Sequence, residues 1–221
     1  MDALLQQFFN LDVMAQAWPL VLKGLGMTAL LCLAVIPLGL GGGLLVALAS
    51  LSGSRALRWS VRVFADLFRA LPPLVLLILI YSGLPFAGIR LSPFAAVCLA
   101  FLLNASSFYG EIYRAGIESV GRGQWEAARS TGLTAGQAFG YVILPQAVRN
   151  VLPDLVSNTV EVVKLTSLAS VVSFTELLYA ADMARSVTYN ASPIVLAALI
   201  YLAILWPVVR LTSRLEHRIA A

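Results

Sequence analysis

Charged side chains inside apolar segments are the residues of this chain best suited to chemistry. Glu161 and Lys164 lie three residues apart in SNTVEVVKLTS, so a helix would place both on one face. Charges inside membrane helices are costly and often mark the path of a solute or ion. With Asn158 before them and Thr166 and Ser167 after them, they form a candidate polar lining for such a path. The alternative is an ion pair that faces neighbouring helices.

A second pair, Asp66 and Arg69, has the same spacing near the start of an apolar segment. Residues three apart share a helix face. Long basic side chains near the end of a membrane helix also extend toward the interface. For this pair, a structural ion pair or an interfacial position is therefore favoured over a functional role.

Motifs for nucleotide binding and hydrolysis are absent from the sequence. It contains no GxxxxGK[ST], GxSxG or HExxH pattern, and its two lysines are Lys23 and Lys164. His217 is the single histidine, and Cys32 and Cys98 lie in apolar runs without the spacing of a metal site. We therefore expect no catalytic residue and no bound metal. Any energy that the protein uses must come from a partner or from an ion gradient.

The composition predicts an all-α integral membrane protein of one domain, residues 1–221. The chain is 60% hydrophobic and 12% charged, whereas soluble domains are about 25% charged. Residues 1–22 form an amphipathic lead-in, and residues 173–193 form a mixed loop. Five segments are long enough to span a bilayer, which takes about 20 apolar residues: 25–51, 63–83, 93–113, 151–172 and 194–212.

The distribution of arginine and lysine predicts the orientation of these spans. If the spans alternate, three basic groups fall on one side: Arg55, Arg58 and Arg62, then Arg114, Arg122, Arg129 and Arg149, then Arg210, Arg214 and Arg218. The opposite side has Lys23, Arg90 and Arg185. Because the basic side is normally cytoplasmic, we expect the N-terminus outside and the C-terminus in the cytoplasm.

Between the third and fourth spans lies a polar stretch, 123–145, which this orientation places in the cytoplasm. Its first part is rich in helix formers and is interrupted by Gly132. Thr134 and Gln137 match a capping box that would begin a second helix, and Pro145 would end or bend it. The apolar face of this second helix would hold Ala135, Ala138, Phe139, Val142 and Ile143. The helix pair would contact either a soluble partner or the lipid interface.

Small residues in the first span predict close helix packing rather than a hinge, because glycine lets helices approach closely in lipid. They are Gly39, Gly41, Gly42 and Gly43. The third span is expected to continue as a helix into water through Glu111, Arg114 and Glu118.

Four sequence blocks resemble permease subunits of the polar amino acid ABC importers. They are LFRALPPL at 67–74, EIYRAGIESVGRGQWEAA at 111–128, LPQAVRNVLP at 144–153 and KLTSLAS at 164–170. The second block carries the Glu126-Ala127-Ala128 triplet of the family's EAA loop, and Gly132 follows it. The chain departs from the family pattern at Leu165, where aspartate is usual, and at Glu161, where an apolar or small residue is expected.

This resemblance implies a type I ABC importer permease fold with five transmembrane helices and a cytoplasmic coupling helix between spans 3 and 4. The chain would form the path for ATP-driven amino acid uptake across the bacterial cytoplasmic (inner) membrane. It would pair with a second permease subunit, identical or homologous, and bind two ATPase subunits. A periplasmic or lipid-anchored binding protein would deliver the amino acid. The chain itself would hydrolyse no ATP, bind no cofactor and bind no nucleic acid, since ATP and Mg would sit on the partner ATPases.

The resemblance also assigns residues to the contact with the ATPase, in a coupling helix at about 124–133. They are Gln124, Glu126, Ala127, Ala128, Arg129 and Gly132. If Glu161 faces the solute path, it would favour a cationic group such as the side chain of a basic amino acid.

Two other classes of function fit parts of the sequence. An ion-coupled transporter or channel would use Asp66, Glu161 and Lys164 as ion or proton sites. Against it, the sequence shows no inverted repeat, and such a carrier has no need of the 123–145 stretch. A membrane scaffold would use that stretch to recruit a soluble enzyme.

Overall fold

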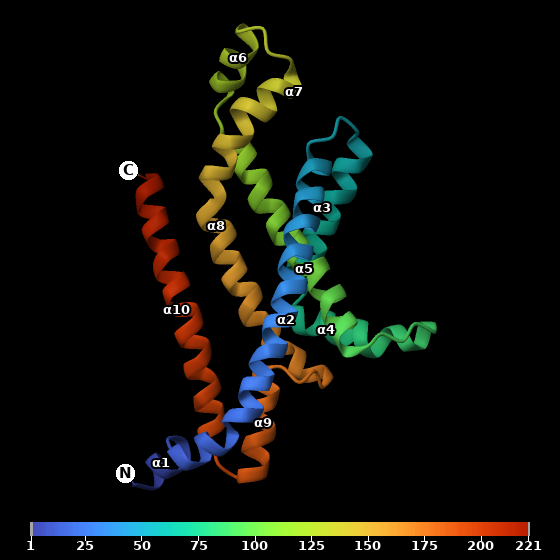
Figure 1. Cartoon of the computed structure of the whole chain (residues 1–221). Helices are drawn as coiled ribbons and strands as arrows, with labels where there is room; N and C mark the ends of the chain where they lie inside the picture. The colour runs from blue at the N-terminus through green and yellow to red at the C-terminus, as the bar shows by residue number, and fades with distance from the viewer. Residues whose placement is uncertain (1, 221) are drawn as a thin grey trace. The chain divides into compact units, whose positions relative to one another are not determined.

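The computed structural model describes the backbone of residues 2–220 and the side chains of residues 2–213, and these residues form helices and connecting turns without strands (Figure 1). This confirms the all-α prediction. The side chains of Arg214, His217 and Arg218 lie outside the described residues. The α-helices are α1 (Asp2–Phe8), α2 (Leu11–Ser50), α3 (Arg55–Ala70), α4 (Pro73–Ile78), α5 (Pro93–Ser119), α6 (Arg122–Ser130), α7 (Ala135–Ala138), α8 (Leu144–Leu165), α9 (Leu177–Thr188) and α10 (Ser192–Ala220).

Four shorter helical turns complete the chain. Two are π-helical, η1 (Leu79–Gly83) and η3 (Phe139–Ile143), and two are 3-10, η2 (Leu84–Ala87) and η4 (Thr166–Val172).

Among the described residues, four helical stretches are long and apolar enough to cross a membrane: 2–50, 93–119, 135–172 and 192–213. A fifth crossing exists if Arg55–Ala70 and Pro73–Ala87, which meet at 101°, count as one broken span. The predicted span at 63–83 therefore contains a sharp bend. Pro72 and Pro73 are the cause, because proline donates no backbone hydrogen bond and forces the preceding residue, Leu71, into an extended conformation.

Two further boundaries differ from the predictions. Helix α2 begins at Leu11, so the expected amphipathic lead-in is largely part of the first membrane helix. The expected loop at 173–193 contains α9, which begins where the Glu176 carboxylate accepts the N–H groups of Leu178 and Tyr179 at 2.8 Å each. The cap fixes a short helix where the mixed polarity of the sequence predicted none.

The described chain packs as two compact units, each built from separated stretches. The first unit contains residues up to Pro37, then Pro72–Phe101 and Val160–Val209. The second contains Leu38–Leu71, Leu102–Thr159 and the end of the chain. The assignment of residues 1–221 to one domain stays a prediction.

The core of the first unit joins α2, α9 and α10 through small and aliphatic side chains, namely Ala17, Val21, Leu177, Ala181, Ala184 and Ala197. Gly24 permits the closest approach, since a Cβ at this position would lie 2.6 Å from the Cβ of Ala180. A polar link crosses the same core, because the Thr28 hydroxyl accepts the N–H of Leu177 at 3.0 Å.

The second unit is built around contact between α2 and α5. A Cβ at Gly39 would lie 2.9 Å from that of Ala105, and Cβ atoms at Gly42 and Gly43 would collide with Ser106 and Tyr109. Close packing at the predicted glycines is thus confirmed for three positions, whereas Gly41 has nothing within 4 Å of its Cβ position. Helix α5 also continues to Ser119, as predicted for the third span.

Candidate functional site

Helix α6 and the turn that follows it form the core of the predicted coupling region (Figure 1). The helix ends at Ser130, and the N–H of Gly132 bonds to the carbonyl of Arg129 at 3.1 Å. Gly132 has a φ of +87°, in the left-handed region that favours glycine. A Cβ here would meet nothing within 4 Å. The backbone conformation, rather than lack of space, therefore requires glycine, which confirms the predicted break.

The capping box that begins α7 is also confirmed. The Thr134 hydroxyl accepts the N–H of Gln137 at 3.3 Å, and the Gln137 amide accepts the N–H of Thr134 at 2.9 Å. The helix does not stop at Pro145, because the chain continues from η3 into α8 without a break. The wider π-turn directly before Pro145 accommodates a residue that lacks a donor.

An apolar cluster fixes this region to the end of α5 and the start of α8. Its buried members are Ile117, Val120, Ile143 and Ala147, and Trp125, Phe139 and Val142 pack against them. The rings of Trp125 and Phe139 stack with centroids 6.1 Å apart. Of the predicted apolar face, Ala135 is exposed while the other four residues pack inward. The coupling region is therefore a structured platform.

Two polar contacts reinforce the attachment. Asn150 donates to the Ser119 hydroxyl at 2.8 Å, joining α8 to α5. The Gln146 side-chain amide donates to the Gln124 side-chain oxygen Oε1 at 3.4 Å and to the Val142 backbone carbonyl at 2.7 Å.

The residues predicted to contact an ATPase are mostly open to solvent. Gln124, Glu126, Ala127, Arg129 and Gly132 are exposed, whereas Ala128 is 6% exposed and packs inward. The Arg129 guanidinium donates to the carbonyl of Leu133 at 2.7 Å, so it supports the turn while remaining on the surface. The exposed members therefore lie on α6 and the turn after it, whereas the Ala128 side chain is buried.

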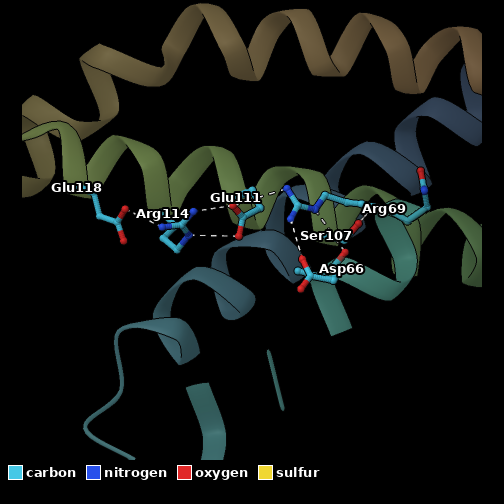
Figure 2. Close-up of polar contacts among 8 residues, drawn as sticks. Asp66, Arg69, Ser107, Glu111, Arg114 and Glu118 are labelled. Carbon is cyan, nitrogen blue, oxygen red and sulfur yellow. Dashed lines mark hydrogen bonds and ion pairs between the residues drawn. The ribbon is translucent and has the colours of Figure 1, made fainter. Parts of the chain in front are cut away.

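Figure 2 shows a ladder of alternating charges that joins α3 to α5 within the second unit. Asp66 pairs with Arg69 at 3.1 Å, as predicted, and Arg69 reaches Glu111 at 3.7 Å. Glu111 pairs with Arg114 at 2.7 Å, and Arg114 pairs with Glu118 at 2.6 Å. The ladder brings together the first two sequence blocks, LFRALPPL and EIYRAGIESVG. The Arg69–Glu111 contact was missed because spacing within one helix carries no information about a contact between two helices.

On α8 the predicted ion pair between Glu161 and Lys164 is present. Both side chains are open, 62% and 49% exposed respectively, so they point away from the packed interior of their unit. An ion pair at this position in a membrane helix is stable only beside water or another protein surface, because lipid does not solvate charge.

The other predicted path residues do not share this open face. Thr166 is fully buried, and its hydroxyl donates to the Val163 carbonyl at 2.6 Å. Asn158 belongs to the second unit, where its Nδ2 is buried without a hydrogen-bond partner among the described residues. Ser167 is partly buried and bonds to the carbonyl of Lys164 at 2.8 Å. Within the described chain, no group of three or more potential metal-ligating residues occurs.

Glu176 is a buried carboxylate that the sequence did not single out. Besides capping α9, it accepts a hydrogen bond from the Tyr201 hydroxyl of α10 at 3.3 Å. Burial raises the pKa of this carboxyl, while its hydrogen bonds to the backbone and to Tyr201 act in the opposite direction. An acidic residue directly before a run of helix formers was the available signal.

The chain combines long apolar helices, which suit a membrane, with two features that suit contact with a partner or a solute. These are the exposed helix α6 and the open charge pair on α8. Residues 39–221 match the family described as Binding-protein-dependent transport system inner membrane component, and the chain belongs to this family. It is therefore an ABC transporter permease, a non-hydrolytic membrane subunit, and ATPase activity lies with partner subunits. The family implies an inner-membrane location, an ATPase, a binding protein and a second permease.

Comparison with named proteins agrees with this assignment. The chain is 36% identical over 209 residues to the L-cystine transport system permease protein TcyB of Bacillus subtilis (strain 168), covering 93% of this chain and 88% of TcyB. It is 31% identical over 185 residues to the arginine transport system permease protein ArtQ of the same organism, covering 83% and 84%. Among solved structures, a crystal structure of an amino acid ABC transporter with histidines matches at a TM-score of 0.86 and 37% identity, covering 93% of this chain and 96% of that one.

Proposed function

We propose that this permease carries an amino acid into the cell, driven by ATP hydrolysis in partner subunits. The observation that carries the proposal is the open Glu161–Lys164 pair on α8. The lysine offers a partner to the carboxylate that every amino acid carries, and the glutamate offers one to a positively charged side chain such as that of arginine or lysine. The names of the similar permeases and of the similar transporter structure support this class of solute.

The platform of α6 and α7 contacts the ATPase and transmits its motion to the membrane helices. The chain has no nucleotide motif, so ATP and Mg bind to the partner ATPases. Two ATPase subunits dock on two permease subunits, identical or homologous, through the exposed residues Gln124, Glu126, Ala127, Arg129 and Gly132. Closure of the ATPases moves the platform, and the helices expose the solute path to each side in turn. A ligand can shift this equilibrium only if it binds one of the two states more tightly than the other.

The orientation follows from the basic groups at the helix ends. The N-terminus lies outside and the C-terminus lies in the cytoplasm, which also places α6 and α7 on the cytoplasmic side. A binding protein, free in the periplasm or held by a lipid anchor, delivers the amino acid from outside.

The role of Glu161 is tested by Glu161→Gln in the reconstituted complex. We expect uptake of arginine or lysine to fall roughly tenfold, the effect of losing one charge-assisted hydrogen bond of about 1.5 kcal/mol. Uptake of glutamine should change much less. The matched control is Asp154→Asn, which removes an exposed carboxylate two helical turns earlier on α8. Equal losses for basic and neutral amino acids would show that Glu161 does not select for a positive charge.

A further inference from the structure

A hollow of about 390 Å³ lies in the first unit where the end of α1 meets the turn between α9 and α10. It is lined by polar side chains and by one aromatic ring, from Gln7, Arg185, Ser186, Tyr189, Asn190 and Ala191. None of these residues takes part in the charge pair on α8 or in the α6–α7 platform.

Hydrogen bonds clamp the N-terminal segment to the turn between α9 and α10 at this hollow (Figure 1). The N–H of Ala191 donates to the Gln7 carbonyl at 3.0 Å, and the Asn190 amide donates to the Gln6 carbonyl at 2.8 Å. The N–H of Asn10 donates to the Ser192 hydroxyl at 2.9 Å. The turn that carries Tyr189 is therefore fixed to the N-terminal segment by three hydrogen bonds directly after Tyr189.

Tyr189 is the unusual residue of this surface. Its φ of 51° lies in the left-handed region, which is unfavourable for a bulky side chain. Its side chain is 89% exposed, so the ring contributes little to packing within the chain. Glycine would form this helix end with less strain. A strained, exposed aromatic residue on a clamped turn indicates a contact outside the chain, and tyrosine is among the residues that contribute most to protein interfaces.

The chemistry of the hollow fits a protein surface that forms hydrogen bonds. Arg185 is paired with Asp182 at 2.7 Å, so the positive charge is compensated and an isolated anion gains little here. The remaining lining offers amide, hydroxyl and phenol groups. Helix α1 and the residue that follows it expose apolar side chains that suit the membrane interface, Leu4, Leu5, Phe8 and Phe9. The clamp therefore lies at the membrane surface, within reach of a partner in water.

We propose that this hollow, with Tyr189 at its rim, is a docking surface for the substrate-binding protein. The proposal rests on the proposed function, since the N-terminus and the α9–α10 turn lie outside only in that orientation. The occupant follows from the family, whose transport depends on a binding protein, and from the polar, charge-compensated lining.

The test uses the complete permease–ATPase complex in lipid nanodiscs with the amino-acid-binding protein that stimulates ATP hydrolysis by the wild-type complex. Tyr189→Gly removes the ring and keeps the left-handed turn. Tyr189→Asn is a second variant, because asparagine also tolerates this conformation. Val187→Ala is the control, because Val187 is 80% exposed on the same helix and does not line the hollow.

We expect both Tyr189 variants to raise the binding-protein concentration for half-maximal stimulation by roughly tenfold, as for loss of an interface anchor. Basal ATP hydrolysis should be unchanged, and Val187→Ala should shift the concentration less than about twofold. A wild-type half-maximal concentration in both Tyr189 variants would overturn the docking surface alone. Absence of stimulation by any amino-acid-binding protein in the wild type would overturn the proposed function, and this inference with it.

Discussion

At the scale of single residues, the coupling turn depends on one backbone torsion. Gly132 adopts a φ of +87° with free space around its Cβ position. Any other residue would carry strain of about 1–3 kcal/mol in the left-handed region. The exposed surface of α6 therefore keeps its position only while the turn keeps this conformation.

Gly132→Ala should accordingly reduce coupling without preventing insertion into the membrane. We expect fewer amino acids to be transported per ATP hydrolysed, because the strained turn displaces α6 at the ATPase contact. The measurement is the ratio of uptake to ATP hydrolysis in vesicles. Gly136→Ala is the matched control, since Gly136 lies in α7 with no positive φ and open space around it. A normal ratio in Gly132→Ala would remove the turn from the coupling mechanism.

At the scale of helices, the contact between α2 and α5 is set by where glycine occurs. Gly42 faces Ser106 and Leu102 closely, whereas Gly41 faces open space one residue away. Adjacent residues on a helix point about 100° apart, so the pair compares a packed and an unpacked position on one element.

Gly42→Leu should therefore destabilise the permease, by about 1–3 kcal/mol for an overpacked contact. The measurement is the thermal unfolding midpoint of the purified protein in detergent. Gly41→Leu should leave the midpoint close to that of the wild type. If both variants shift it equally, close α2–α5 packing at Gly42 is not a determinant of stability.

Local features of these elements were predictable from sequence, and contacts between elements were not. The Thr134–Gln137 capping box and the Gly132 break depend on residues within four positions of each other, so pattern alone identifies them. The Arg69–Glu111 contact joins helices α3 and α5, and α9 owes its start to the buried cap Glu176. The bend at Pro72–Pro73 lies inside the predicted span 63–83, which was defined by apolar length alone.

The candidate sites show the same division. The pairing of Glu161 with Lys164 followed from their spacing, whereas Thr166 proved buried at the start of η4, directly after α8. Helix α6 was predicted, but the burial of Ala128 was not. Spacing therefore predicted which residues pair, and packing decided which candidate residues are exposed.

At the scale of the whole molecule, the proposed transport requires that partner ATPases drive this chain through direct contact. The permease has an open charge pair on α8. Its exposed helix α6 packs through Trp125 on the apolar cluster at the ends of α5 and α8. A partner that moves the platform can change access to the path without any chemistry in this chain.

The most direct test is ATP-dependent uptake of radiolabelled amino acids by vesicles that contain the complete complex, with wild-type permease or Glu126→Lys. Glu126→Lys reverses an exposed charge on α6. The new positive charge should weaken the ATPase contact, because it either repels a like charge there or is left without a partner. We expect ATP-dependent uptake in the wild type and at least a roughly tenfold loss in Glu126→Lys, corresponding to ~1.4 kcal/mol or more, with equal amounts of permease in the membrane. Wild-type uptake that proceeds without ATP, or undiminished uptake in Glu126→Lys, would contradict it.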